Sequence, residues 1–131
     1  MVPELTCASL QDSLAFYLGV LGFTTCYQRD GFAYLNIGEA QLMLEQGPSD
    51  WIAGPLDRPY GRGVNLQIEV ESVGPMLKRL ADEGHQLFMG VRDQWYRANE
   101  LEHGQREFIV QDPDGYLLRF CEVLGERSAS T

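Results

Sequence analysis

The stretch SLQDSLAFYLGVLG, residues 9–22, decides the fold, because its plan returns 63 positions later (72 − 9) as SVGPMLKRLADEG, residues 72–84. Both segments begin with a serine suited to cap a helix, carry apolar residues at helical spacing and end in glycine. Ser9 is followed three residues later by Asp12, which predicts a capping box, and Ser72 takes the place of Ser9 in the second segment. The pattern predicts two amphipathic helices built on one plan.

Strands surround each predicted helix in the same order. One short strand precedes the helix, and three strands separated by turn residues follow it. The order strand, helix, strand, strand, strand therefore occurs twice, which predicts an α+β fold of two βαβββ modules. Neither module can bury its sheet alone, so we expect one domain over residues 1–124. The predicted parts are module one (1–47), a linker rich in Gly and Pro (48–62), module two (63–124) and a frayed tail (125–131).

The two modules can be aligned position by position. The 63-residue offset of the helices places Val2 over Asn65, whereas Met43 and Arg119, in the two closing strands, are 76 residues apart (119 − 43). The second module therefore contains 13 extra residues (76 − 63). The segment DQWYRANELEHG, residues 93–104, accommodates them, and we expect it to form a loop.

The composition limits the classes of partner. The chain has 131 residues, enough for a hydrophobic core, and its net charge of −9 disfavours nucleic acid and membrane surfaces while attracting cationic ligands. No apolar run reaches the roughly 20 residues that span a bilayer, and the first residues lack a secretory signal, so we expect a cytoplasmic location. Cys7, Cys26 and Cys121 lie in predicted strands and are expected to be buried, reduced thiols.

Three segments resemble one known family. SLAFYLGVLGF (13–23), EAQLMLEQ (39–46) and REFIVQDPDGYLLRF (106–120) are similar to the vicinal oxygen chelate superfamily, also called the glyoxalase/bleomycin-resistance fold, and occur in its order. The resemblance implies that the strands of each module curve into a half-barrel. It leaves the function open, because the superfamily includes isomerases, dioxygenases and transferases as well as non-catalytic drug-binding proteins.

The resemblance also implies four metal-ligand positions, which fall here on Val2, Met43, Asn65 and Arg119. Val2 has no donor atom, and Met43 offers a soft thioether that suits hard divalent ions poorly. Asn65 offers one carbonyl oxygen, whereas the guanidinium of Arg119 stays protonated and would repel a dication. We therefore expect no metal and no cofactor.

Strand alternation assigns other side chains to the cup of each half-barrel. In module one, Met43 and Glu45 share a face. A tight turn at Gly38–Glu39 places Tyr34 opposite Met43. The same turn places Phe32 opposite Glu45.

In module two, Asn65, Gln67 and Glu69 share a face with one another. If the DPDG segment forms a two-residue turn, Phe108 lies across from Arg119, whereas a one-residue bulge would reverse this pairing. The cup then has an aromatic side and a polar side.

Aromatic residues outside the strands complete the predicted site. Trp51 lies in the linker, and Trp95 and Tyr96 lie in the insertion, where loops could cover the mouth of the cup. Planar aromatic walls with a few polar groups suit a flat, partly charged molecule. The alternative for Phe32, Tyr34 and Phe108 is an ordinary core position. The predicted ligand-binding residues are Phe32, Tyr34, Met43, Glu45, Trp51, Asn65, Gln67, Glu69, Trp95, Tyr96, Phe108 and Arg119, with no catalytic and no metal-binding residue.

Within the superfamily, the chain is most similar to bleomycin-resistance proteins, in its acidity, its missing metal ligands and the REF segment before an Asp-Pro turn. That resemblance implies a homodimer that holds a cationic, planar-tailed drug in crevices between subunits and releases it unchanged. It implies that Phe32 and Tyr27 take the places of aromatic drug contacts. Gln67 and Gly104 stand where tryptophans occur, and Trp95 could compensate. We expect a metal-free protein that sequesters a cationic or aromatic compound stoichiometrically.

Two other functions stay open. The first is a lyase, isomerase or dioxygenase-type enzyme of the same fold, in which Glu45, Glu69 or Glu107 is the acid or base and Arg119 stabilises an anion. The second is an interaction module whose aromatics serve dimer packing. The neighbouring Glu102 and His103 fit either a surface pair or a catalytic pair.

Overall fold

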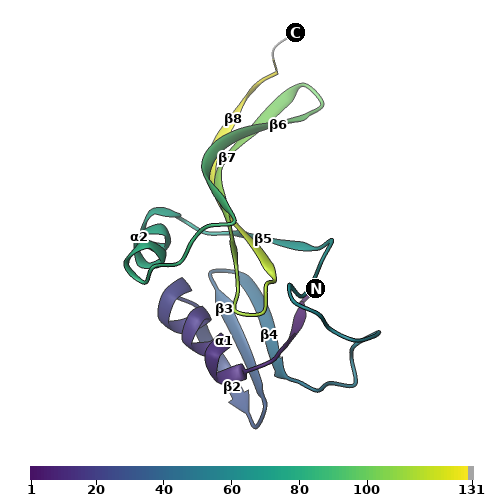
Figure 1. Cartoon of the computed structure of the whole chain (residues 1–131). Coiled ribbons are helices and arrows are strands. Elements are labelled where there is room, and N and C mark those ends of the chain that lie inside the picture. Colours follow the sequence, from purple (N-terminus) through teal and green to yellow (C-terminus); the bar gives the residue numbers. More distant parts are fainter. Residues whose placement is uncertain (130–131) are drawn as a thin grey trace.

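The computed structural model describes residues 1–129, which form two four-stranded sheets and their helices (Figure 1). The elements in chain order are β1 (Glu4–Cys7), α1 (Leu10–Phe16), the π-helical turn η1 (Tyr17–Leu21), β2 (Thr24–Arg29), β3 (Phe32–Ile37), β4 (Ala40–Gln46), β5 (Asn65–Glu69), α2 (Gly74–Asp82), β6 (Met89–Ala98), β7 (Leu101–Gln111) and β8 (Leu117–Ser128). The strand orders are β1-β4-β3-β2 and β5-β8-β7-β6, and the strand before each helix pairs in parallel with the last strand of its module. The predicted α+β fold of two βαβββ modules is confirmed.

The two helices begin differently, although their sequences predict one plan. The hydroxyl of Ser9 accepts a hydrogen bond from the Asp12 amide at 3.2 Å, as predicted. The second helix instead starts after Val73, whose amide donates to a carboxylate oxygen of Glu122 at 3.0 Å. The cap residue thus lies one position later than predicted, while the hydroxyl of Ser72 still accepts a hydrogen bond from the Gly74 amide at 3.4 Å.

One apolar cluster joins both modules. Alternate residues of the two sheets face the helices, and the rings of Phe23 and Phe120 meet edge to face at 6.4 Å. The sheet residues of this cluster include Leu5, Cys7, Ala33, Leu35, Leu42, Leu44, Ile68, Phe108, Val110, Leu118 and Phe120. The helices therefore cover one face of each sheet and leave its other face open. A single domain over 1–124 stays a prediction about folding, to which this shared cluster gives a physical basis.

Buried hydrogen bonds also tie the modules together. The hydroxyl of Tyr17 donates to Asp112 at 2.8 Å, and the hydroxyl of Tyr116 donates to the carbonyl of Thr6 at 2.9 Å. Burial raises the pKa of Tyr17, with a further contribution from the charge of Asp112, and burial likewise raises the pKa of Asp112. Asp112 stands at the start of the last hairpin loop, so this contact fixes the loop against α1 and η1.

The second module carries an arm, formed by residues 94–105 and 123–128, that projects beyond the rest of the molecule (Figure 1). The predicted insertion loop is instead the tip of a hairpin, in which β6 and β7 pair out to Ala98 and Leu101. The predicted frayed tail is wrong for 125–128, because β8 pairs with β7 as far as Ser128. The remaining tail residues Ser130 and Thr131 lie outside the described part of the chain.

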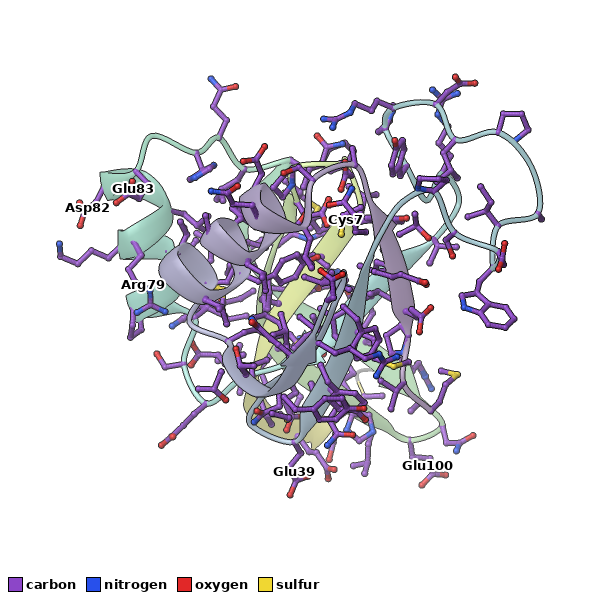
Figure 2. The ribbon with its side chains drawn as sticks, turned by 90° about the horizontal axis from the view of Figure 1, so that it is seen from below. Cys7, Glu39, Arg79, Asp82, Glu83 and Glu100 are labelled. Carbon is purple, nitrogen blue, oxygen red and sulfur yellow. The ribbon has the colours of Figure 1, made fainter. Side chains whose placement is uncertain are left out.

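The three cysteines do not share one environment. Cys7 and Cys121 are buried, and burial raises the pKa of the Cys7 thiol to about 11. Cys7 lies in the interior of the molecule in Figure 2. Cys26 is exposed, so the prediction of a buried thiol is wrong there, because β2 is an edge strand and exposed along its length. Among the described residues, no helix is long and apolar enough to span a membrane.

Candidate functional site

Three aromatic rings stack on the open face of the first sheet. The rings of Tyr27 and Tyr34 lie 5.3 Å apart with planes 21° from parallel, and Tyr27 stacks on Phe32 at 6.0 Å. The guanidinium of Arg29 lies 3.8 Å from the centre of the Phe32 ring. Phe32 is 5% exposed, whereas Tyr27 is 51% exposed. We call Tyr27, Phe32 and Tyr34 the aromatic platform.

The predicted register of this face is confirmed. Strands β3 and β4 pair Tyr34 with Met43 and Phe32 with Glu45 across a two-residue turn. The hydroxyl of Tyr34 also donates to the side-chain oxygen of Gln41 at 2.8 Å. Because paired residues point to the same side of a sheet, four predicted site residues share the open face. Whether they contact a ligand stays a prediction.

Glu4, which the sequence analysis left out of the site, lies beside Glu45. Strand β1 pairs Glu4 with Met43, and Val2 lies before the strand begins. A hydrogen bond to Glu45 raises the pKa of Glu4, and burial and the negative charge of Glu45 add to this, while Arg29 opposes it. The proton of Glu4 is therefore lost at a higher pH than that of an isolated glutamate. If the start of β1 had been known, its pairing with β4 would have placed Glu4 beside Met43 and so in the site.

The open face of the second sheet carries a buried ion pair. Arg119 donates from Nε to Glu107 at 2.5 Å and from Nη2 to the hydroxyl of Tyr96 at 2.7 Å, and Tyr96 in turn hydrogen-bonds to Glu107. Glu107 is completely buried. Burial alone would raise the pKa of Glu107, but the hydrogen bonds from Arg119 and Tyr96 outweigh it, so the net shift is downward. Glu107 is thus stabilised in its ionised form, and the guanidinium of Arg119 neutralises its charge.

Phe108 does not line the cup, so this part of the prediction is wrong. The residue opposite Arg119 is Ile109, and Phe108 is paired with Phe120, on which its ring stacks at 5.6 Å. The cause is the hairpin turn: it is longer than two residues, with Asp112 and Tyr116 closing it by a backbone hydrogen bond of 3.0 Å. The longer turn shifts the register by one residue and sends Phe108 into the core.

The polar residues of β5 are exposed on the edge of the second sheet. Asn65 and Gln67 line a cavity of ≈ 330 Å³ together with Gln41 of the first sheet, so the structure brings these residues together. Glu69 lines a different groove of ≈ 820 Å³, beside Glu39 and Arg79. Among the described residues, no hydrogen bond or ring contact links the aromatic platform to Arg119.

The two tryptophans and Tyr96 do not form one lid. Trp51 is 78% exposed in the linker. Trp95 lies within β6, opposite Gly104, and the guanidinium of Arg127 lies 4.1 Å from its ring. A Cβ atom at position 104 would come within 2.6 Å of the indole, so Trp95 fills the space above this glycine. Trp95 and Tyr96 are consecutive strand residues, so they point to opposite faces, and Tyr96 alone joins the open face with Arg119.

Glu102 and His103 also lie on opposite faces of β7. Glu102 accepts from Arg127 at 2.9 Å, and His103 lies 3.3 Å from Glu126. All four are charged or titratable residues of the arm. The two residues therefore form separate pairs across β7 and β8, and their side chains point to opposite faces of the strand.

One known family accounts for most of the chain. The family model described as the Glyoxalase/Bleomycin resistance protein/Dioxygenase superfamily matches residues 3–120. The chain belongs to this superfamily. The matched region runs from just before β1 into the first part of β8.

Similar relatives within the superfamily cover nearly the whole chain. Bleomycin resistance proteins of Geobacillus stearothermophilus and Staphylococcus aureus are 29% identical over 134 residues, covering 94% of this chain and 96% of theirs. Among solved structures, TioX from Micromonospora sp. ML1 has a TM-score of 0.74 at 19% identity, covering 95% of this chain and 98% of that one. A bleomycin-binding protein complexed with bleomycin has a TM-score of 0.63 at 22% identity, covering 93% and 96%. These two structures share the fold.

The four positions that the superfamily resemblance assigns to metal ligands are not paired with one another across the strands. Met43 is paired with Glu4, two residues after Val2, and Arg119 is paired with Gln67, two residues after Asn65. Among the described residues, no three His, Cys, Asp or Glu side chains are grouped so that they could hold a metal ion. The donors present, a carboxylate and an amide on separate sheets beside a thioether and a guanidinium, fit a divalent metal poorly.

Proposed function

We propose that this protein binds a cationic aromatic compound stoichiometrically and without a metal, on the open face of the first sheet, and releases it unchanged. The main observation that supports the proposal is the aromatic platform. Its rings are already stacked, so a planar compound can extend the stack with little rearrangement, and Tyr27 is half exposed beside it. Glu4 and Glu45 place negative charge on the same face.

The relatives support this class of ligand. Curated proteins of similar length and 29% identity are named bleomycin resistance proteins, and a protein of the same fold was solved in complex with bleomycin. The net charge of −9 favours a positively charged compound over an anionic one. By this proposal the protein would confer resistance by lowering the concentration of free drug.

A second copy of the chain is the proposed cover for the site. The arm has an exposed strand edge, and apolar side chains along it are open to solvent, with Leu101 40% exposed and Val123 63% exposed. Sheet edges and apolar patches of this kind favour association. In a homodimer, the arm of one protomer would cover the open face of its partner.

Calorimetric titration of metal-free bleomycin tests the proposal. We expect saturation at one drug molecule per chain, with the drug recovered chemically unchanged by mass spectrometry. Recovery of a converted compound would favour the enzyme hypothesis instead. Absence of binding at high micromolar drug would exclude bleomycin as the ligand, and one tightly held zinc, iron or manganese ion per chain by elemental analysis would contradict metal-free capture. Light scattering at the same concentrations measures the oligomeric state.

A further inference from the structure

A cavity of ≈ 560 Å³ lies between β1 and the linker, and we call it the β1–linker cavity. Its volume falls within the range of about 300–1,000 Å³ that is usual for small-molecule sites. Its walls are mostly apolar or aromatic, with Trp51, Ile52, Leu56, Val64 and Tyr116 among them. Glu4 is the one charged side chain among these lining residues, all of which belong to the described part of the chain. The cavity thus combines a single carboxyl group with an apolar wall.

The carboxyl group in this wall has no cationic partner in contact. Glu4 forms its hydrogen bond with Glu45, a like-charged group, and the described ion pairs include neither residue. Ser49 donates from its hydroxyl to Glu45 at 3.1 Å, and the Trp51 amide donates to Ser49 at 3.1 Å. Through these two bonds the loop that carries Trp51 is fixed to the carboxyl pair. A positive charge entering here would favour the ionised form of Glu4.

We propose that the β1–linker cavity holds the positively charged part of an aromatic small molecule, with the Glu4–Glu45 pair as its counter-ion and Trp51 as its aromatic wall. This inference rests on the proposed function and names the place where the charge of the ligand is held. Trp51 is 78% exposed, so a bound aromatic cation would bury an indole that now faces water. A second copy of the chain is the alternative occupant of this cavity, and light scattering separates it from a small cation.

Binding at this site releases a proton. The charged groups that face Glu4 are Glu45 on β4 and Arg29 on β2, and Glu45 raises the pKa of Glu4. A cation favours the ionised form of Glu4, so its affinity rises as the pH rises and Glu4 loses its proton. The number of protons released is largest at acidic pH, where Glu4 still holds its proton before the ligand binds.

Calorimetry with N-methylacridinium, a planar cation whose charge does not titrate, tests the proposal. Titrations from pH 5 to 8, each in two buffers of different ionisation enthalpy, give the affinity and the number of protons released. We expect Glu4→Gln to weaken binding about tenfold at pH 7.5, the loss expected for one charge-assisted contact. We also expect proton release to disappear in this variant. Glu45→Gln should behave in the same way.

Glu39→Gln is the matched control, since it removes the same charge from an exposed turn at the periphery of the molecule (Figure 2). We expect this variant to bind within about twofold of the wild type, because screening weakens a distant exposed charge. If Glu4→Gln binds and releases protons as Glu39→Gln does, the cation site is refuted while wild-type binding still supports the proposed function. If the wild type binds neither N-methylacridinium nor bleomycin, both proposals fail. If Glu4→Gln changes the mass in light scattering and leaves binding intact, a second copy occupies this surface and the cation site is refuted.

Discussion

Replacing Arg119 with methionine should leave Glu107 as a buried carboxylate without its cation. Glu107 is completely buried, and it accepts hydrogen bonds from Arg119 and from Tyr96. Breaking a buried ion pair costs about 3–5 kcal/mol. Arg119 is 23% exposed and Tyr96 still donates in the variant, so we expect the lower part of this range, about 3 kcal/mol at pH 7. Methionine keeps much of the aliphatic stem, which limits the loss of packing.

The cost should depend on pH with a definite sign. The folded-state pKa of Glu107 is lowered, because the hydrogen bonds from Arg119 and Tyr96 outweigh the effect of burial. A carboxyl group of this kind contributes stability above its unfolded pKa of about 4.3, and the contribution is lost as the pH falls through the folded value. The free energy of unfolding of the wild type should therefore exceed that of Arg119→Met most at pH 7. The difference should shrink toward pH 4, where Glu107 in the variant takes up a proton.

Urea denaturation at fixed protein concentration, at pH 7 and at pH 4, measures both effects. In the double variant Glu107→Gln/Arg119→Met the unpaired carboxylate at this position is gone, so the variant should be more stable at pH 7 than Arg119→Met alone. Arg106→Met is the matched control, since Arg106 pairs with the carboxylate of Asp93 at 2.7 and 3.1 Å but both side chains are half exposed, and we expect no resolvable change. Equal losses for Arg119→Met and the control, or a loss that is the same at both pH values, would refute the reasoning.

Three further changes test other contacts. Tyr17→Phe removes the buried bond to Asp112 and should cost about 1–3 kcal/mol in urea denaturation, and an unchanged midpoint would show that the bond contributes nothing. Gly104→Ala should displace Trp95, because the new Cβ would lie 2.6 Å from the indole, and this should be visible as a red shift in tryptophan fluorescence; an unshifted spectrum would contradict the stacking. Tyr27→Ala should weaken bleomycin binding about tenfold in calorimetry, as expected for one lost stacking contact, and full affinity would exclude the aromatic platform.

The overall fold could be predicted because its signals are local. Helical spacing between Ser9 and Gly22, repeated after 63 residues, depends on neighbours within one turn, and so does the capping bond of Ser9. The register of β3 and β4 was also predictable, since a two-residue turn at Gly38–Glu39 allows only one register between the two strands. These features need no knowledge of the other module.

The register of β7 and β8 could not be predicted from local signals, because contacts from elsewhere fix the turn. Asp112 accepts hydrogen bonds from the amides of Asp114 and Tyr116 with one oxygen and from the distant Tyr17 with the other. This arrangement stabilises a longer turn than the sequence DPDG suggests by itself, and it moves Phe108 into the core. The bond between residues 17 and 112 becomes visible once the two modules are packed together.

Whether the carboxylates of an open face already have a cationic partner decides which face can attract a cation. On the second sheet, the negative charge of Glu107 is already neutralised by Arg119, and both are held by Tyr96. On the first sheet, Glu45 lies beside Glu4 and raises its pKa, and the more distant Arg29 opposes this. An external cation would have to break an existing pair on the second sheet, whereas on the first it meets two neighbouring carboxyl groups that belong to none of the described ion pairs. The first sheet is therefore where a positive ligand gains most, and this choice follows from the pairing of charges and not from the net charge of the chain.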